Sequence, residues 1–172
     1  MELTAYFAYG SNINVSYLKH YLEACKTSPA GVQNEQRAIL HGWRLRTNCV
    51  TESSGGAANI EPHHGSSVEG VAMEISPAVH EVLRAKEDWP DGYKEVAVSL
   101  ELPGPPKTER TAVTYVVTDK YALPFDEPVS VEYRHIILTA AHRLGFNDAY
   151  QQYLRTLLVP FVQHKKIRLM KG

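Results

Sequence analysis

The spacing of hydrophobic and polar residues changes along the chain, and each change marks an expected element. Residues 3–9 are rich in strand-favouring side chains, whereas from Asn14 onward apolar residues recur as in an amphipathic helix. Further strands are expected at residues 38–47, 57–60, 68–75, 94–102 and 110–118. The proline and glycine at 62–65 predict a turn that pairs the strands on either side of it as a hairpin.

Helices are expected mainly around this run of strands. Ser76 and Pro77 form a typical helix start, and this helix should end near residues 87–88. Two more helices are expected at residues 130–144 and after Asn147. Because strands outnumber helices in the middle of the chain and do not alternate with them regularly, the pattern predicts an α+β domain rather than a doubly wound parallel sheet.

The composition is typical of an ordinary globular domain. The chain has 172 residues, of which 44% are hydrophobic and 22% charged, and no apolar run is long enough to cross a bilayer. We expect a single domain over residues 1–160 and a basic tail at 161–172. The net charge of −1 argues against nucleic acid or a membrane surface as the main partner, so we expect a small-molecule ligand.

The N-terminus and the cysteines suggest a compartment. Residues 1–4 lack the basic start and apolar core of a secretory signal. Cys25 and Cys49 match no metal-ligand spacing, and we expect both to be reduced structural thiols. A cytoplasmic location is therefore expected.

The stretch Tyr9-Gly10-Ser11-Asn12 is the first candidate for chemistry. Gly10 falls between the first strand and the helix from Asn14, where its conformational freedom suits a tight turn. The backbone N–H groups that follow would lie at a helix N-terminus, where carboxylates and phosphates bind. Without a ligand, Gly10 could simply make the turn, and Ser11 or Asn12 could simply cap the helix.

The second candidate is Glu87, at the expected end of the helix that starts at Ser76. The helix C-terminus, Asp88 and the indole of Trp89 would each raise the pKa of this carboxyl group. Lys86 would lower that pKa. A glutamate with a raised pKa can act as a general base and then a general acid near neutral pH. The alternative is a solvated helix end with all its acids facing water.

Other polar residues are weaker candidates. His63 and His64 could bind a metal together with His41 or Cys49, but adjacent side chains point apart in a strand, so we expect structural or rim roles. Ser11 lacks the pattern of a nucleophile elbow. The sequence therefore predicts neither a metal site nor an organic cofactor.

Both main candidates lie in blocks that resemble one known family. The chain is similar to the γ-glutamylcyclotransferase-like family in its opening block, Tyr6-Phe7-Ala8-Tyr9-Gly10-Ser11-Asn12. It also matches the family's catalytic-glutamate block through Leu83, Glu87, Gly92 and Tyr93. Asp88 stands where the family usually has glycine. Weaker similarity at residues 57–71 and at Tyr133 extends the match, and ordered blocks are more specific together than singly.

The resemblance implies a small mixed β-barrel with helices packed outside. It also implies a transferase or lyase reaction in which the α-amine of a γ-glutamyl group attacks its own γ-carbonyl, releasing an amine or amino acid and closing 5-oxoproline. Glu87 would move the protons, and the turn from Tyr9 to Asn12 would hold the glutamyl carboxylate or the oxyanion. Tyr93 and Tyr133 would line the site, and no cofactor would be needed.

Two other functions stay open on the sequence alone. A non-catalytic module could use the same turn to bind γ-glutamyl or other carboxylate ligands. A hydrolase could use water at the same glutamate and release free glutamate. The leaving group is not specified, because the loops around His63 and at residues 122–128 lie where the resemblance fades. A homodimer is compatible with each of these functions.

Overall fold

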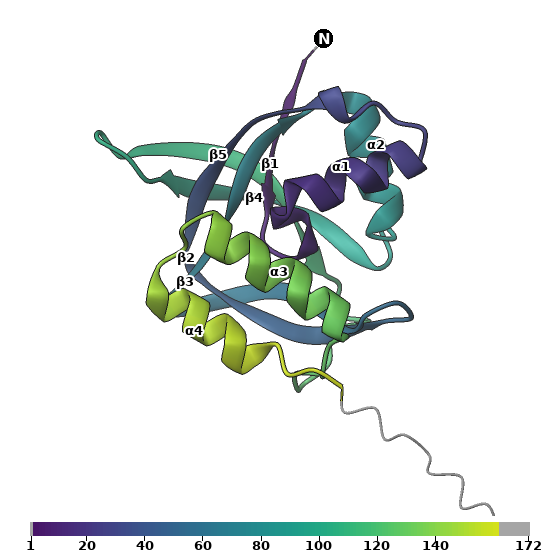
Figure 1. The fold of residues 1–172 in the computed structure, drawn as a ribbon, viewed down its shortest axis with the longest axis vertical. Helices are drawn as coiled ribbons and strands as arrows, with labels where there is room; N and C mark the ends of the chain where they lie inside the picture. Colours follow the sequence, from purple (N-terminus) through teal and green to yellow (C-terminus); the bar gives the residue numbers. More distant parts are fainter. Residues whose placement is uncertain (1, 162–172) are drawn as a thin grey trace, which may run out of the picture.

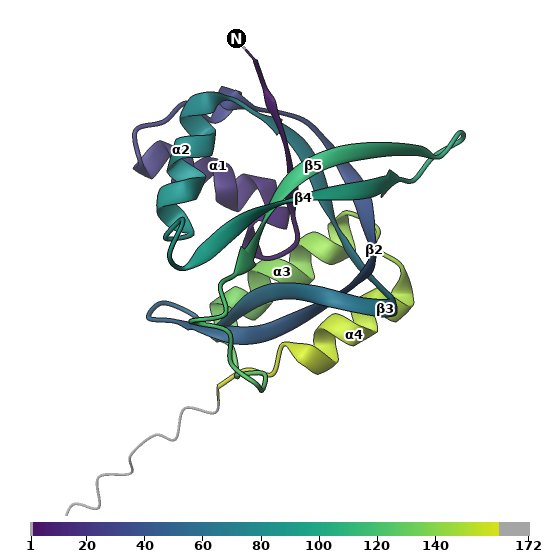
Figure 2. The same ribbon diagram turned by 180° about the vertical axis from the view of Figure 1, so that it is seen from behind.

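Five strands close into a barrel, with helices packed outside it, in the computed structural model, which describes residues 2–161 (Figures 1 and 2). The strands are β1 (Thr4–Ala8), β2 (Val32–Thr51), β3 (Gly55–Ile75), β4 (Tyr93–Leu102) and β5 (Thr108–Val117). The helices are α1 (Val15–Ala24), α2 (Pro77–Lys86), α3 (Val131–Arg143) and α4 (Asp148–Leu157), with short 3₁₀ turns η1 (Ser11–Ile13) and η2 (Pro29–Gly31). The α+β class and the barrel with external helices are confirmed.

Strand β1 closes the barrel. It pairs antiparallel with β3 on one side and parallel with β5 on the other, where Tyr6 lies opposite Val113. Its last three residues, Tyr6, Phe7 and Ala8, are all buried, as expected for a strand covered on both faces. The chain that leaves Ala8 is therefore held at one end of the barrel.

Strands β2 and β3 form one long antiparallel hairpin, so the hairpin predicted within residues 57–75 is wrong. The two strands pair from Val32 opposite Ile75 to Thr51 opposite Gly55, and they bend together around the barrel (Figure 2). The proline and glycine at 62–65 lie inside β3, at a register shift opposite residues 41–43, where Gly65 has a φ of 79°. Bulges and turns favour the same residue types, which explains the error.

Helices α2, α3 and α4 begin where the sequence predicts. The side chains of Ser76, Ser130 and Asn147 accept hydrogen bonds from backbone N–H groups at the starts of α2, α3 and α4. In both views α1 and α2 lie at one end of the molecule, and α3 and α4 lie together at the other (Figures 1 and 2). No helix among residues 2–161 is long and apolar enough to cross a membrane. The predicted basic tail lies, apart from Phe161, outside the described residues.

Glu95 on β4 fixes helix α2 against the barrel. Arg84 of α2 donates two hydrogen bonds to its carboxylate, from Nε to Oε1 at 2.9 Å and from Nη2 to Oε2 at 3.0 Å. Nε2 of His80 lies 2.6 Å from Oε1, and the hydroxyl of Tyr115 donates to the same oxygen at 2.9 Å. The bonds from Arg84, then Tyr115 and His80, lower the pKa of Glu95 to about 2. The orientation of α2 determines where its last residue and Glu87 lie.

The first prediction concerns the charge of Glu95. Its pKa lies below the ordinary value of 4.5 in the folded state, so its contribution to stability is present above about pH 4.5 and is lost as the pH falls toward 2. We expect Glu95→Gln to lower the free energy of unfolding by about 2 kcal/mol at pH 7. The difference from the wild type should shrink as the pH falls through this range.

Urea unfolding at a series of pH values measures both effects. Glu109→Gln, at an exposed position of the neighbouring strand β5, is the matched control and should change stability by less than about 0.5 kcal/mol. A stability loss in Glu95→Gln that stays constant from pH 7 to pH 2.5 would show that the charge is not what fixes the helix.

Candidate active site

A cavity of about 330 Å³ opens where the chain leaves β1. Seven tyrosines line it: Tyr6, Tyr9, Tyr17, Tyr21, Tyr93, Tyr115 and Tyr133. Lys86 and Glu87 are the charged residues among its described lining residues. All the site residues predicted from the sequence lie around this one cavity.

The turn at residues 9–12 forms as predicted, but not for the predicted reasons. Gly10 has a φ of −100°, so it does not use the left-handed conformation that favours glycine. A Cβ at this position would lie 3.0 Å from the Cβ of Ala58 and 3.2 Å from the hydroxyl oxygen of Tyr133. Close packing therefore requires the glycine.

Helix α1 begins where the sequence predicts, but neither Ser11 nor Asn12 caps it. Asn14 is the N-cap of α1, and its Oδ1 accepts a hydrogen bond from the N–H of Tyr17 at 3.2 Å. Ser11 and Asn12 belong to the short turn η1 instead, and they do not cap α1. Within residues 2–161, the backbone N–H groups of Ser11 and Asn12 have no hydrogen-bond acceptor, and both residues line the cavity.

Glu87 follows the last residue of α2, and its backbone N–H donates to the carbonyl oxygen of Leu83 at 2.9 Å. Its side chain lines the cavity and is 18% exposed. Burial raises the pKa of this carboxyl group, as predicted. The charge of Lys86, whose Nζ lies 3.9 Å from Oε1 of Glu87, partly opposes that rise.

Asp88 and Trp89 do not produce this shift. Both are exposed, and the indole of Trp89 packs on the guanidinium group of Arg84, whose Cζ is 4.5 Å from the ring centroid. The predicted contributions of these two neighbours are therefore wrong, although the predicted direction is correct. Burial of the carboxyl group is the cause.

The backbone explains how Asp88 can stand where the resembled family usually has glycine. Asp88 has a φ of 50°, the left-handed conformation that commonly ends a helix, and aspartate tolerates it better than most residues. The N–H of Gly92 then donates to the carbonyl oxygen of Asp88 at 2.7 Å. A Cβ at Gly92 would lie 3.0 Å from the carbonyl oxygen of Glu87, so this turn is closely packed.

Lys86 joins the end of α2 to the 9–12 turn, a link that the sequence did not reveal. Its Nζ donates to Oδ1 of Asn12 at 2.7 Å, and Nδ2 of Asn12 donates to the hydroxyl of Tyr6 at 3.0 Å. The side chain of Asn12 is therefore bonded within the protein. Only the position of Lys86 next to Glu87 hinted at a place in the site.

The predicted tyrosines make hydrogen bonds to the barrel backbone. The hydroxyl of Tyr133 accepts a hydrogen bond from the N–H of Ala58 at 2.9 Å. The hydroxyl of Tyr93 donates one to the carbonyl oxygen of Ala58 at 3.2 Å. The hydroxyl of Tyr9 donates to the carbonyl oxygen of Tyr115 at 2.5 Å. Burial raises the pKa of Tyr9, Tyr93 and Tyr133, so all three are neutral phenols at physiological pH.

The tip of the β2–β3 hairpin supplies lining residues that the sequence analysis missed. Thr51, Ser53 and Ser54 face the cavity, and Oγ1 of Thr51 lies 2.6 Å from Oγ of Ser54. The carbonyl oxygen of Ser54 accepts a hydrogen bond from the N–H of Ser130 at 2.7 Å, which joins the tip to the start of α3. A serine-rich loop gives no local signal for such a role.

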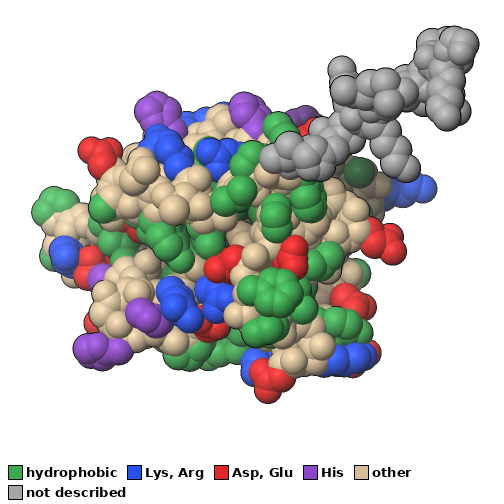
Figure 3. Space-filling view, turned by 90° about the horizontal axis from the view of Figure 1, so that it is seen from below, with side chains coloured by type: hydrophobic (Ala, Val, Ile, Leu, Met, Phe, Trp, Pro, Cys, Tyr) green, Lys and Arg blue, Asp and Glu red, His purple; other side chains and the backbone are tan. Residues whose placement is uncertain are grey.

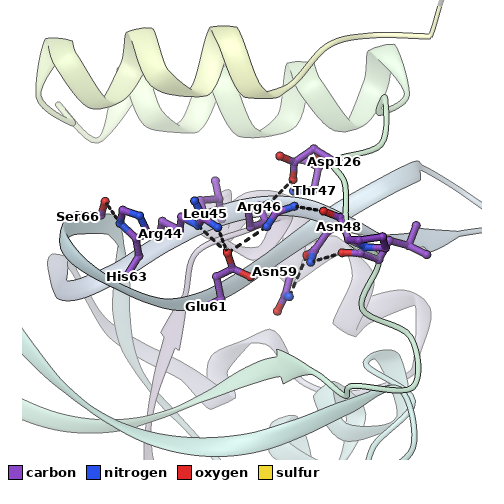
Figure 4. Close-up of polar contacts among 12 residues, drawn as sticks. Arg44, Leu45, Arg46, Thr47, Asn48, Asn59, Glu61, His63, Ser66 and Asp126 are labelled. Atoms are coloured by element: carbon purple, nitrogen blue, oxygen red, sulfur yellow. Dashed lines mark hydrogen bonds and ion pairs between the residues drawn. The ribbon is translucent and has the colours of Figure 1, made fainter.

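The histidines considered as metal ligands do not line this cavity. His63 is exposed, and its Nδ1 lies 2.8 Å from Oγ of Ser66 (Figure 4). Near it, Glu61 accepts hydrogen bonds from Arg44 at 2.6 Å and Arg46 at 3.0 Å. Among the described residues, no group of three or more His, Cys, Asp or Glu side chains is placed to hold a metal ion. On the face in Figure 3, basic, acidic and hydrophobic side chains are intermixed.

Comparison with known proteins gives the family. A model of the family described as gamma-glutamyl cyclotransferase, AIG2-like, matches residues 6–135, which include both the 9–12 turn and Glu87. The chain belongs to this family. A comparison of the sequence with curated proteins finds no match.

Solved structures share the fold over nearly the whole chain. One named gamma-glutamyl cyclotransferase has a TM-score of 0.79 and 23% identity, covering 95% of this chain and 93% of that one. A human protein described as uncharacterised has a TM-score of 0.76 and 23% identity, over 96% and 94% of the two chains. A yeast gamma-glutamyl cyclotransferase specific to glutathione has a TM-score of 0.69 and 17% identity, over 92% and 95%. These likenesses show the barrel of the cyclotransferase family.

The second prediction tests why this member of the family has glycine at residue 10. A valine side chain there would press on Ala58 and Tyr133, and such overpacking costs about 1–3 kcal/mol. We expect Gly10→Val to be less stable than the wild type by about this amount and to bind 5-oxoproline at least about tenfold more weakly. Gly10→Ala should show smaller effects of the same sign.

Thermal unfolding and calorimetric titration with 5-oxoproline check the two effects. Gly104→Val is the matched control, because a Cβ at Gly104 would find its nearest neighbour only at 3.8 Å. Wild-type stability and affinity in Gly10→Val would show that the turn does not need the close approach.

Proposed function

We propose that the protein is a γ-glutamyl cyclotransferase. It would convert a γ-glutamyl compound into 5-oxoproline and a free amine or amino acid. One observation carries the proposal. The carboxyl group of Glu87, with its raised pKa, lines the same cavity as the two unbonded N–H groups of the 9–12 turn. The family match and the fold support it.

The first step needs a base close to the α-amine of the substrate. The carboxylate of Glu87 takes a proton from the α-ammonium group, and the free amine attacks the γ-carbonyl carbon of the same glutamyl group. Because the nucleophile belongs to the substrate, the protein need only hold the glutamyl side chain bent, with the amine next to the γ-carbonyl carbon. Binding in a small cavity provides that constraint.

The second step breaks the original amide bond. The attack places negative charge on the former carbonyl oxygen, and the N–H groups of Ser11 and Asn12 stabilise it. The protonated carboxyl group of Glu87 then gives its proton to the departing nitrogen, and the carboxylate that results takes the second proton from the ring nitrogen. The carbon–nitrogen bond breaks, and 5-oxoproline and the amine leave. Neither step draws on a metal or an organic cofactor.

Three of the lining tyrosines are held in place by hydrogen bonds to the backbone. The hydroxyls of Tyr9, Tyr93 and Tyr133 are engaged with the backbone, so the rings form a fixed lining around the reacting group. A cytoplasmic location and a small-molecule partner, rather than nucleic acid or a membrane, remain predictions.

A panel of γ-glutamyl amino acids, γ-glutamylamines and glutathione tests the proposal. Mass spectrometry should find 5-oxoproline together with the free amine or amino acid from at least one compound. Free glutamate in place of 5-oxoproline would indicate a hydrolase instead. Binding without any product would indicate a non-catalytic module and would contradict the proposal.

The third prediction assigns the proton transfers to Glu87. The amide in Glu87→Gln keeps the shape of the acid but cannot exchange protons, and general acid–base catalysis contributes about 10²- to 10⁴-fold. Because one group serves both steps, we expect kcat to fall by about 10⁴-fold or more while substrate affinity changes little. Single-turnover assays and a binding titration separate these quantities.

Asp88→Asn is the matched control for this variant. Asp88 is exposed, and asparagine also tolerates the left-handed conformation at this position. We expect its kcat and its pH profile to match those of the wild type, since Asp88 does not shift the pKa of Glu87. An active Glu87→Gln beside an inactive Asp88→Asn would transfer the catalytic role to the neighbour.

A further inference from the structure

Lys86 is a cation that lines the cavity, and the proposed reaction assigns it no role. The Nζ of Lys86 lies 5.8 Å from the ring centroid of Tyr17 and 5.4 Å from that of Tyr21, both on helix α1. The side chain of Lys86 is 16% exposed, and it lines the cavity. A lysine enclosed to this extent is usually held by close anionic partners, whereas the carboxylate of Glu87 lies 3.9 Å away, beyond hydrogen-bond distance.

We propose that Lys86 binds the α-carboxylate of the substrate's γ-glutamyl group, so that Lys86 and Glu87 together recognise the head group of an α-amino acid. The inference rests on the proposed function, because that function brings a glutamyl group into this cavity. Nothing in the family resemblance assigns a role to this lysine.

The two charges match that head group in sign and spacing. An α-amino acid carries its ammonium and carboxylate groups on one carbon, with the nitrogen and the carboxyl carbon about 2.5 Å apart. Nζ of Lys86 and Oε1 of Glu87 lie 3.9 Å apart and carry the opposite charges. The substrate ammonium can therefore face Glu87 while its carboxylate faces Lys86, each at hydrogen-bond distance.

Lys86 has hydrogen-bonding capacity left for this partner. An ammonium group has three N–H donors, and among the described residues one hydrogen bond from Lys86 is found, to Oδ1 of Asn12 at 2.7 Å. Burial lowers the pKa of Lys86, whereas the charge of Glu87 raises it. A bound carboxylate would add a second anion and stabilise the charged lysine.

This arrangement divides the anionic groups of the reacting substrate between two receptors. Asn12 holds Lys86 at the side of the 9–12 turn, and the hydroxyl of Tyr6 fixes the amide of Asn12 in turn. With the α-carboxylate on Lys86, the N–H groups of Ser11 and Asn12 stay free for the oxyanion that forms at the γ-carbon. The sequence motif leaves open whether the 9–12 turn binds the carboxylate or the oxyanion, and this proposal assigns the oxyanion to it.

A pair of binding probes isolates the carboxylate contact. 5-Oxoproline and 2-pyrrolidinone share the same lactam ring, and only the first carries a carboxylate. We expect Lys86→Met to weaken the binding of 5-oxoproline by about 10- to 100-fold, the usual effect of losing a charge-assisted hydrogen bond in a partly buried site. The binding of 2-pyrrolidinone should not change. Both are measured by NMR titration.

Lys19→Met is the matched control because it removes the same charge outside the cavity. Lys19 lies on α1, its side chain is 38% exposed, and its Nζ is 2.7 Å from Oε1 of Glu35. We expect this variant to bind both probes like the wild type. Lys86→Arg should recover part of the affinity for 5-oxoproline, since it restores the charge.

Several results would overturn the inference. These are unchanged 5-oxoproline binding in Lys86→Met, an equal loss of affinity for both probes, and no wild-type binding of 5-oxoproline at millimolar concentration. A different result would contradict the proposed function. Carboxylate-dependent binding through Lys86, without turnover of any γ-glutamyl compound, would contradict the cyclotransferase and support the inference. Turnover with an unchanged KM in Lys86→Met would contradict the inference alone.

Discussion

Closure of the barrel through β1 is the constraint on which the cavity depends. Both edges of this strand are paired, to β3 and β5, and the hydroxyl of Thr114 also donates to the carbonyl oxygen of Phe7 at 2.9 Å. A strand held in this way cannot shift its register without exposing buried side chains. The 9–12 turn is therefore fixed at the mouth of the barrel, beside the cavity that it lines.

Helix α2 brings the second half of the site to the same place. Its attachment to Glu95 sets its direction, so the residues at its end, Lys86 and Glu87, enter the cavity beside the turn. Burial raises the pKa of Glu87 and the neighbouring ammonium group limits the rise. In the proposed reaction these two groups serve as base and anion receptor, and both line the same cavity.

The sequence predicts the parts of this site that are local. The 9–12 turn and the end of α2 each have a local sequence signal. The first is a glycine after a strand, and the second is an acidic residue after an amphipathic helix. The link from Lys86 to Asn12 spans 74 residues, and no local pattern reports it. The turn at Gly10 was correctly predicted, but for the wrong reason. Glycine is needed there because Ala58 and Tyr133, which are remote in sequence, leave no room for a side chain.

The state of the Glu87 carboxyl group is the centre of this account, and NMR can measure it directly. Selective ¹³C labelling of glutamate side chains, with the Glu87 signal assigned by its loss in Glu87→Gln, gives the pKa of this one group. We expect a midpoint above the ordinary value of 4.5 and, since the charge of Lys86 lowers the pKa, a still higher midpoint in Lys86→Met. A wild-type midpoint at or below 4.5 would contradict the account.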